Sequence, residues 1–173
     1  MKTILHNILL LFLLTTCSAF SQTTPVKDSL LDQMVGKWIL QGTIAGQETT
    51  HDIIVDWVLG HQYIQLKEVS REKDSNDRPI YEAIVFITRD QTLNQYTCLW
   101  LDNTGNGGLS AQAIGHASRN GDNLEFIFGI SDSSTFNTTF IFDKNSNSWQ
   151  WHMDSKENNT IQPFARVRLT KGE

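Results

Sequence analysis

Apolar and polar residues alternate along most of the chain after Gly36. The alternation is clearest in four runs, 51–57, 124–128, 136–142 and 149–153, where apolar side chains are separated by Asp, Glu, Asn, Gln, Thr or His. A period of two is typical of β-strands with one buried face and one face in solvent. The pattern predicts about ten strands, at roughly 36–44, 47–58, 61–71, 79–88, 94–102, 108–118, 122–129, 134–142, 148–154 and 162–170.

Short polar segments separate these runs, and none of them has the length of a crossover helix. Asn120-Gly121, for example, is typical of a two-residue hairpin turn. Sequential strands with short connections predict an antiparallel meander, which avoids exposed edges by closing on itself. The predicted fold class is therefore all-β: a single up-and-down β-barrel of about 8–10 strands, preceded by a short helix that Asp28 can cap and Gly36 ends.

Acidic residues indicate which face of each strand lies outside the barrel. Asp52, Asp56, Glu82, Glu125 and Asp154 mark the outer faces of four strands. Tyr96, Cys98 and Trp100 are favoured as the inner face of a fifth strand, because Tyr and Trp carry a polar group that a barrel mouth can use. The inner faces of the first four are predicted to be His51, Ile53, Val55 and Trp57; Tyr81, Ala83, Val85 and Ile87; Leu124, Phe126 and Phe128; and Trp149, Trp151 and Met153.

The strand predicted at 108–118 has an unusual face of mainly small residues: Leu109, Ala111, Ala113, Gly115 and Ala117. If this face points inward, the wall leaves space for a ligand next to the aromatic walls. The alternative is that the small residues receive Trp and Phe rings from across the barrel and the interior packs solid. The pattern leaves both alternatives open.

The first residues predict a secretory signal peptide. Met1 and Lys2 precede an apolar run at 8–14, and Ala19-Phe20-Ser21 fits the small-x-small cleavage rule. The apolar run is shorter than the ~20 residues that a membrane-spanning helix needs, and no later segment approaches that length. We therefore expect a signal peptide at 1–21, a barrel domain at 22–173, and an exported protein, periplasmic or extracellular, without an integral membrane segment.

Cys17 raises the alternative that the exported protein is anchored to a membrane by a lipid. Leu14-Thr15-Thr16-Cys17 partly matches a lipoprotein signal, although Thr16 is bulkier than the usual residue before the cysteine. Lipid anchoring at Cys17 is the minor alternative to cleavage after Ser21. After cleavage at Ser21, Cys98 would have no intramolecular disulfide partner, and the core alone would hold the domain together.

Composition excludes two broad classes. The formal net charge is −5, with 14 basic and 19 acidic residues, and no basic patch is evident, which argues against nucleic acid as a partner. Five Trp and nine Phe in a chain with three Pro indicate a folded domain and not a disordered one.

Gly36-Lys37-Trp38 at the head of the first strand resembles the signature of lipocalins and of the wider calycin superfamily. The resemblance implies that Trp38 closes the barrel base and that a basic residue of the last strand, Arg166 or Arg168, packs over its indole. Two longer segments, 57–64 and 96–103, resemble an uncharacterised bacterial family of lipocalin-like proteins, from which the chain departs at His61. That resemblance implies a calycin-like barrel and brings no substrate.

Motifs for catalysis or cofactors are absent from the sequence. The mature histidines, His51, His61, His116 and His152, form no zinc motif, and no nucleophile elbow, phosphate-binding loop or dinucleotide fingerprint occurs. Haem-binding barrels of the nitrobindin type begin similarly but use a histidine near the chain end, and 161–166 contains none. No metal and no cofactor are predicted, and Cys98 is expected to be a small apolar core residue.

The leading hypothesis is a binding protein for a small apolar or amphipathic molecule in the barrel lumen. An enzyme with His51, Tyr63 or His61 as acid or base at the mouth is the first alternative. A module that contacts another envelope protein through an exposed apolar patch is the second. The oligomeric state stays open. The predicted ligand-binding residues are His51, Trp57, Tyr63, Tyr81, Tyr96, Trp100, Ala113, Phe126, Phe128 and Trp151.

Overall fold

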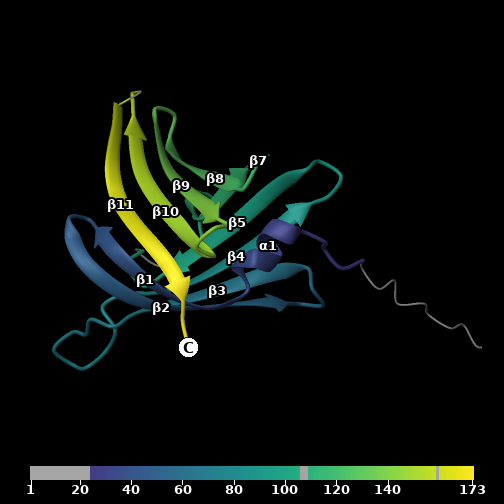
Figure 1. The fold of residues 1–173 in the computed structure, drawn as a ribbon. Helices are drawn as coiled ribbons and strands as arrows, with labels where there is room; N and C mark the ends of the chain where they lie inside the picture. The colour runs from purple at the N-terminus through teal and green to yellow at the C-terminus, as the bar shows by residue number, and fades with distance from the viewer. Residues whose placement is uncertain (1–23, 106–108, 159) are drawn as a thin grey trace, which may run out of the picture.

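The computed structural model describes residues 24–105, 109–158 and 160–173, so the predicted signal peptide and Cys17 lie outside the described residues. A short helix, α1 (Ser29–Met34), is followed only by strands and one 3₁₀ turn. The strands are β1 (Gly36–Ile44), β2 (Gln47–Val58), β3 (Tyr63–Ser70), β4 (Glu82–Asp90), β5 (Gln95–Asp102), β6 (Ile114–Ala117), β7 (Arg119–Asn120), β8 (Asn123–Ser131), β9 (Ser134–Asp143), β10 (Ser148–Glu157) and β11 (Thr160–Lys171) (Figure 1).

Consecutive strands pair antiparallel from β1 to β6 and from β7 to β11, and the first strand pairs with the last. Trp38 of β1 lies opposite Lys171 of β11, and Gly115 of β6 lies opposite Phe128 of β8. β6 and β7 both pair with β8 and so form two pieces of one wall. The result is a closed 10-strand up-and-down barrel, which confirms the predicted fold class. In the part of the chain that is described, no helix has the length and apolar character needed to cross a membrane.

The predicted strand 108–118 is the main correction to the sequence interpretation. Ala111–Ala113 form a 3₁₀ turn, and the strand begins only at Ile114. Alternation assigns faces only while the chain is extended, and a 3₁₀ turn advances about 120° per residue. The inward prediction therefore holds for Gly115 and Ala117, which line the interior, and fails for Leu109, which is 76% exposed.

The interior packs solid over much of its length. A Cβ on Gly115 would lie 2.7 Å from the Phe128 ring, so that ring already fills the space which the small residue leaves. Phe140 stacks on Trp151 with ring centroids 4.7 Å apart, and Trp151 contacts Trp100 above it. Around Gly115, Phe140 and Trp151 the interior is therefore filled by aromatic rings, as the second alternative for the small-residue face predicts.

α1 blocks one end of the barrel, the end at the right in Figure 1. Asp28 caps the helix by accepting hydrogen bonds from the backbone N–H groups of Leu30 (2.9 Å) and Leu31 (3.0 Å). Leu30, Leu31 and Met34 are fully buried against the barrel interior. The Trp38 indole donates to the Met34 carbonyl at 2.7 Å, which joins the helix to the first strand.

The cation over the Trp38 ring is Lys171, with its Nζ 3.8 Å from the ring centroid. The expectation for Arg166 or Arg168 is wrong, because both alternate outward on β11. Arg166 pairs with Asp154 at 2.6 Å, and Arg168 donates to Ser148 at 3.1 Å. The inward positions between and beside them hold Ala165, Val167 and Leu169.

Candidate functional site

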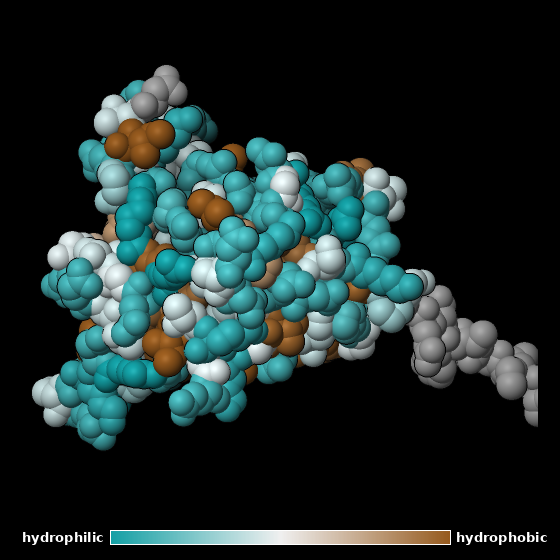
Figure 2. All heavy atoms as spheres, viewed as in Figure 1, coloured by the Kyte–Doolittle hydropathy of each residue, from teal (hydrophilic) through white to brown (hydrophobic). Residues whose placement is uncertain are grey.

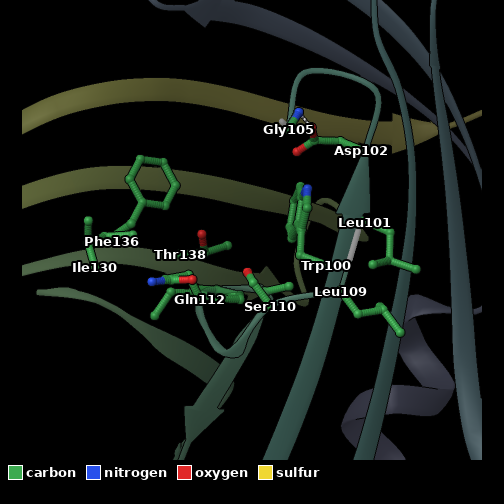
Figure 3. A pocket seen from close by; sticks show the side chains of 12 residues that line it. Trp100, Leu101, Asp102, Gly105, Leu109, Ser110, Gln112, Ile130, Phe136 and Thr138 are labelled. Carbon is green, nitrogen blue, oxygen red and sulfur yellow. Dashed lines mark hydrogen bonds between the residues drawn. The ribbon is translucent and has the colours of Figure 1, made fainter. Parts of the chain in front are cut away.

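Two cavities at the end of the barrel opposite α1 share Trp100, Asp102 and Phe136. One, which we call the His51 cavity, has a volume of about 410 Å³. The other, the Thr138 cavity, has a volume of about 720 Å³, and its lining includes Gly105 and Leu109. A third, of about 410 Å³, lies beside α1 and is lined by Ser29, Arg119 and Phe142 among others. Figure 3 shows Trp100, Phe136 and Thr138 of the Thr138 cavity facing a common space. The His51 cavity contains the buried polar groups and is the candidate site.

A chain of four polar side chains forms one wall of the His51 cavity. Glu72 accepts from the Thr49 hydroxyl at 3.0 Å, and Thr49 Oγ1 lies 2.8 Å from His51 Nε2. His51 Nδ1 in turn lies 2.5 Å from Glu68 Oε1. His51 and Glu68 are buried, with side-chain exposures of 5% and 1%.

The hydrogens of this chain can be assigned from its geometry. The single hydroxyl hydrogen of Thr49 is donated to Glu72, so Thr49 can only accept from His51, and Nε2 carries a hydrogen. The contact between His51 Nδ1 and Glu68 Oε1 then needs one shared proton, held by either group. Both ring nitrogens of His51 are thus occupied within the protein.

Burial raises the pKa of Glu68, and the hydrogen bond from His51 opposes that shift only in part. At the other end of this row of hydrogen-bonded side chains, the pKa of Glu72 is lowered. Burial opposes this shift, but the backbone N–H groups of Glu72 and Thr50 and the Thr49 hydroxyl outweigh it. The wall therefore contains one carboxyl group with a raised pKa, Glu68, and one with a lowered pKa, Glu72.

Glu68 has a second oxygen, Oε2, which is buried and has no hydrogen-bond partner among the described residues. A buried polar atom without a partner costs roughly 1–3 kcal/mol. Native proteins rarely leave such an atom unsatisfied unless water, an ion or a ligand pairs with it. We therefore expect a bound molecule in this cavity to donate a hydrogen bond to Glu68 Oε2.

Aromatic rings cover the polar wall. Tyr81 stacks on His51 with ring centroids 5.5 Å apart, and its hydroxyl accepts from the Trp100 indole at 3.2 Å. Burial, with Glu68 and Asp102 nearby, raises the pKa of Tyr81 well above its usual range. Phe136 and Phe164 meet edge to face at 5.4 Å at the mouth. The cavity thus combines a polar wall with aromatic sides.

The raised pKa of Glu68 makes the stability of the wild-type protein depend on pH. The folded chain binds this proton more tightly than the unfolded chain, for which 4.5 is the ordinary value. This contribution is therefore complete below that value and is lost as the pH rises through the raised pKa. We expect the free energy of unfolding, measured with urea from about pH 4.5 to about pH 8, to fall with a steeper slope in the wild type than in Glu68→Gln. Equal slopes in the two proteins would contradict the shift.

The predicted ligand-binding residues divide into three groups. His51, Tyr81 and Trp100 line the His51 cavity, and Ala113 and Phe128 line the Thr138 cavity. The second group lies in the packed interior and lines neither cavity, and the third lies at the α1 end. The second group consists of Phe126 and Trp151, and the third of Trp57, Tyr63 and Tyr96, whose hydroxyl donates to Asp28.

The histidines and tyrosine of the enzyme alternative do not meet. His61 stacks on Trp57 at 3.9 Å at the α1 end, where Trp57 also donates to Asp32 at 2.9 Å. Tyr63 is 37% exposed and alternates outward from the buried Ile64. Only His51 lies at the open end, and neither of its ring nitrogens is free to act on a substrate.

Sequence reasoning missed Glu68, although a signal was present. In β3 the inward positions are Ile64, Leu66, Glu68 and Ser70, so a carboxyl group continues an apolar face. An acidic residue at an inward position is rarely buried without a partner. Other lining residues that bear on the site were also missed, among them Glu48, Thr49, Glu72, Asp102, Phe136 and Phe164.

Two other features bear on the alternatives. Cys98 is fully buried, and burial raises the pKa of its thiol, so it acts as a small core residue. The outer face of β4, β5 and β6 carries an apolar row formed by Ile84, Phe86, Leu99, Leu101 and Ile114. The face visible in Figure 2 is mostly hydrophilic, with apolar groups in separate small areas.

A scan against models of protein families and a search of curated proteins both found no match for this chain.

Proposed function

We propose that this protein binds a small amphipathic molecule in the open end of its barrel. The observation that carries the proposal is the His51 cavity, which places aromatic sides around a buried wall with an unpaired oxygen, Glu68 Oε2. Its volume of about 410 Å³ falls in the range of small-molecule sites. An apolar molecule alone would leave that oxygen unpaired.

The ligand of this proposal occupies only part of the barrel. Phe128 fills the space at Gly115, and α1 fills the opposite end with Leu30, Leu31 and Met34. Binding therefore involves the upper aromatic residues, Trp100, Tyr81 and Phe136, and not the deeper Phe126 and Trp151. The ligand must therefore be small enough to fit in the open end of the barrel alone, in a cavity of about 410 Å³.

Export and membership of the calycin superfamily belong to the same proposal. The charged start, the apolar run and Ala19-Phe20-Ser21 support export. The closed meander, with Trp38 at its base under Lys171, supports the calycin resemblance. The proposal is therefore a calycin-like binding protein that acts outside the cytoplasm.

Native mass spectrometry of the protein purified from its own host tests the proposal. We expect a second species, heavier than the chain by the mass of one small molecule, that disappears after denaturation. Removal of Phe136, which lines the cavity, should weaken retention of that molecule. The matched control is Phe142→Ala on the same strand, because Phe142 lines the cavity beside α1 and neither of the two cavities at the open end. A chain that carries no added mass and takes up no N-phenyl-1-naphthylamine would contradict the proposal.

A further inference from the structure

The acceptor at the wall of the His51 cavity does not depend on where the shared proton lies. If His51 holds the proton, Glu68 is a carboxylate and Oε2 accepts. If Glu68 holds it, the proton lies on Oε1 towards His51 Nδ1, 2.5 Å away, and Oε2 is the carbonyl oxygen. In both states Oε2 needs a hydrogen-bond donor, and a carboxylate on the ligand could not supply one.

The net charge around the cavity is negative. Glu48, Glu72 and Asp102 line it, Glu68 and His51 share one proton and together carry no net charge, and no Lys or Arg is among the described lining residues. Arg71 adjoins Glu72 in the chain but pairs with Asp52 on the outer face of β2 at 2.6 Å. A cavity with acidic groups and low-dielectric walls concentrates a negative potential, which favours cations.

The aromatic sides of the cavity suit both parts of such a ligand. Tyr81 and Trp100 lie next to the acidic wall, and aromatic faces attract cations. Phe136 and Phe164 lie at the mouth, where they offer apolar surface to a hydrocarbon or ring. The polar group is thus drawn inward and the apolar part lies near the mouth.

We propose that the ligand is an amphiphilic amine, whose ammonium group lies at the wall formed by Glu68 and Glu72 and whose apolar part lies between Trp100 and Phe136. This inference rests on the proposed function and adds the chemical class of the ligand. It distinguishes the cavity from one that takes fatty acids, because a fatty acid would bring a second negative charge and no donor to the same wall.

Isothermal titration calorimetry with three probes of equal chain length tests the class of ligand. Decylamine, decanol and decanoate differ only in the polar group, which is cationic, neutral and anionic at neutral pH. We expect decylamine to bind one molecule per chain at least about tenfold more tightly than decanol, and decanoate to bind most weakly. The preference for the amine should shrink at high salt, while decanol binding should stay constant.

Variants then assign the preference to the cavity. Glu72→Gln and Asp102→Asn, alone and together, should bring decylamine towards the affinity of decanol, so that the ratio of the two affinities falls. The control is Asp56→Asn on the outer face of β2, which should change none of the three affinities. Glu72 and Asp102 are only partly buried, so these variants are expected to fold, and circular dichroism checks that they do.

The outcomes separate this inference from the proposed function. If none of the three probes binds, the proposed binding function itself is overturned. If decanol or decanoate binds as tightly as decylamine, the function stands and the amine class is wrong. If the amine is preferred equally in the wild type and in the double variant, the preference arises outside the His51 cavity and the inference also fails.

Discussion

Replacement of Trp38 by Ala should lower the free energy of unfolding by about 3–5 kcal/mol, the usual cost of deleting a buried Trp ring. Trp38 is 2% exposed and joins three parts of the closed end. Its indole donates to the Met34 carbonyl at 2.7 Å, and its ring packs under Lys171. The variant therefore loses core packing, a hydrogen bond to α1 and a cation–π contact together.

Urea unfolding monitored by circular dichroism measures this loss. Trp57→Ala is the matched control, because Trp57 lies at the same end but is only partly buried and stacks on His61 near the surface. Its loss should be clearly smaller. Equal losses in the two variants would contradict the role of Trp38 as the base of the barrel.

Replacement of Asp28 by Ala should cost about 3–5 kcal/mol of stability, as expected when one member of a buried charge network is removed. Asp28 caps α1 and also accepts from the Tyr96 hydroxyl and from Arg89 at 3.2 Å. Arg119 lies 3.9 Å away. The substitution would remove the buried carboxylate that faces Arg89 and Arg119. It would also break the hydrogen bond that joins the start of the helix to Tyr96 of β5.

The same urea experiment, arranged as a double-mutant cycle with Tyr96→Phe, tests this network. Non-additive losses are expected, because each substitution removes the same hydrogen bond. Burial, then the hydrogen bond to Asp28, raise the pKa of Tyr96 to about 12, so spectrophotometric titration of Tyr96 in Asp28→Ala should shift back towards the ordinary value. Asp32→Ala is the control, since Asp32 is exposed and accepts only from Trp57. Additive losses would mean that Asp28 acts only as a helix cap.

The alternation of residues was sufficient to predict the strands and their inner faces because the side-chain period of a strand is two wherever the chain is extended. The prediction failed where extension ends, at Ala111–Ala113. The expectation of Arg166 or Arg168 over Trp38 came from the family resemblance, and both residues alternate outward on β11. Lys171 takes that place because it lies opposite Trp38 in the register of β1 and β11. That register is set by pairing between the two ends of the chain, and no local pattern reports it.

The candidate site was predicted in part for a related reason. Alternation indicates whether a side chain faces in or out, but it does not give its height along the barrel axis. His51, Trp57 and Tyr96 all face inward, yet only His51 lies at the open end, because α1 fills the other. Glu68 was missed because acidic residues were used as markers of the outer face, and this one is at an inward position.

The central claim is that ligands enter only the end of the barrel opposite α1, and the indole N–H groups of the tryptophans test it directly. In a ¹⁵N–¹H correlation spectrum of the mature chain, each of the five Trp residues gives a separate reporter. Titration with decylamine or N-phenyl-1-naphthylamine should shift the Trp100 signal, because Trp100 lines both cavities, and leave those of Trp38 and Trp57 in place. A spectrum in which Trp100 stays fixed, or in which Trp38 and Trp57 shift as far as Trp100, would contradict the account.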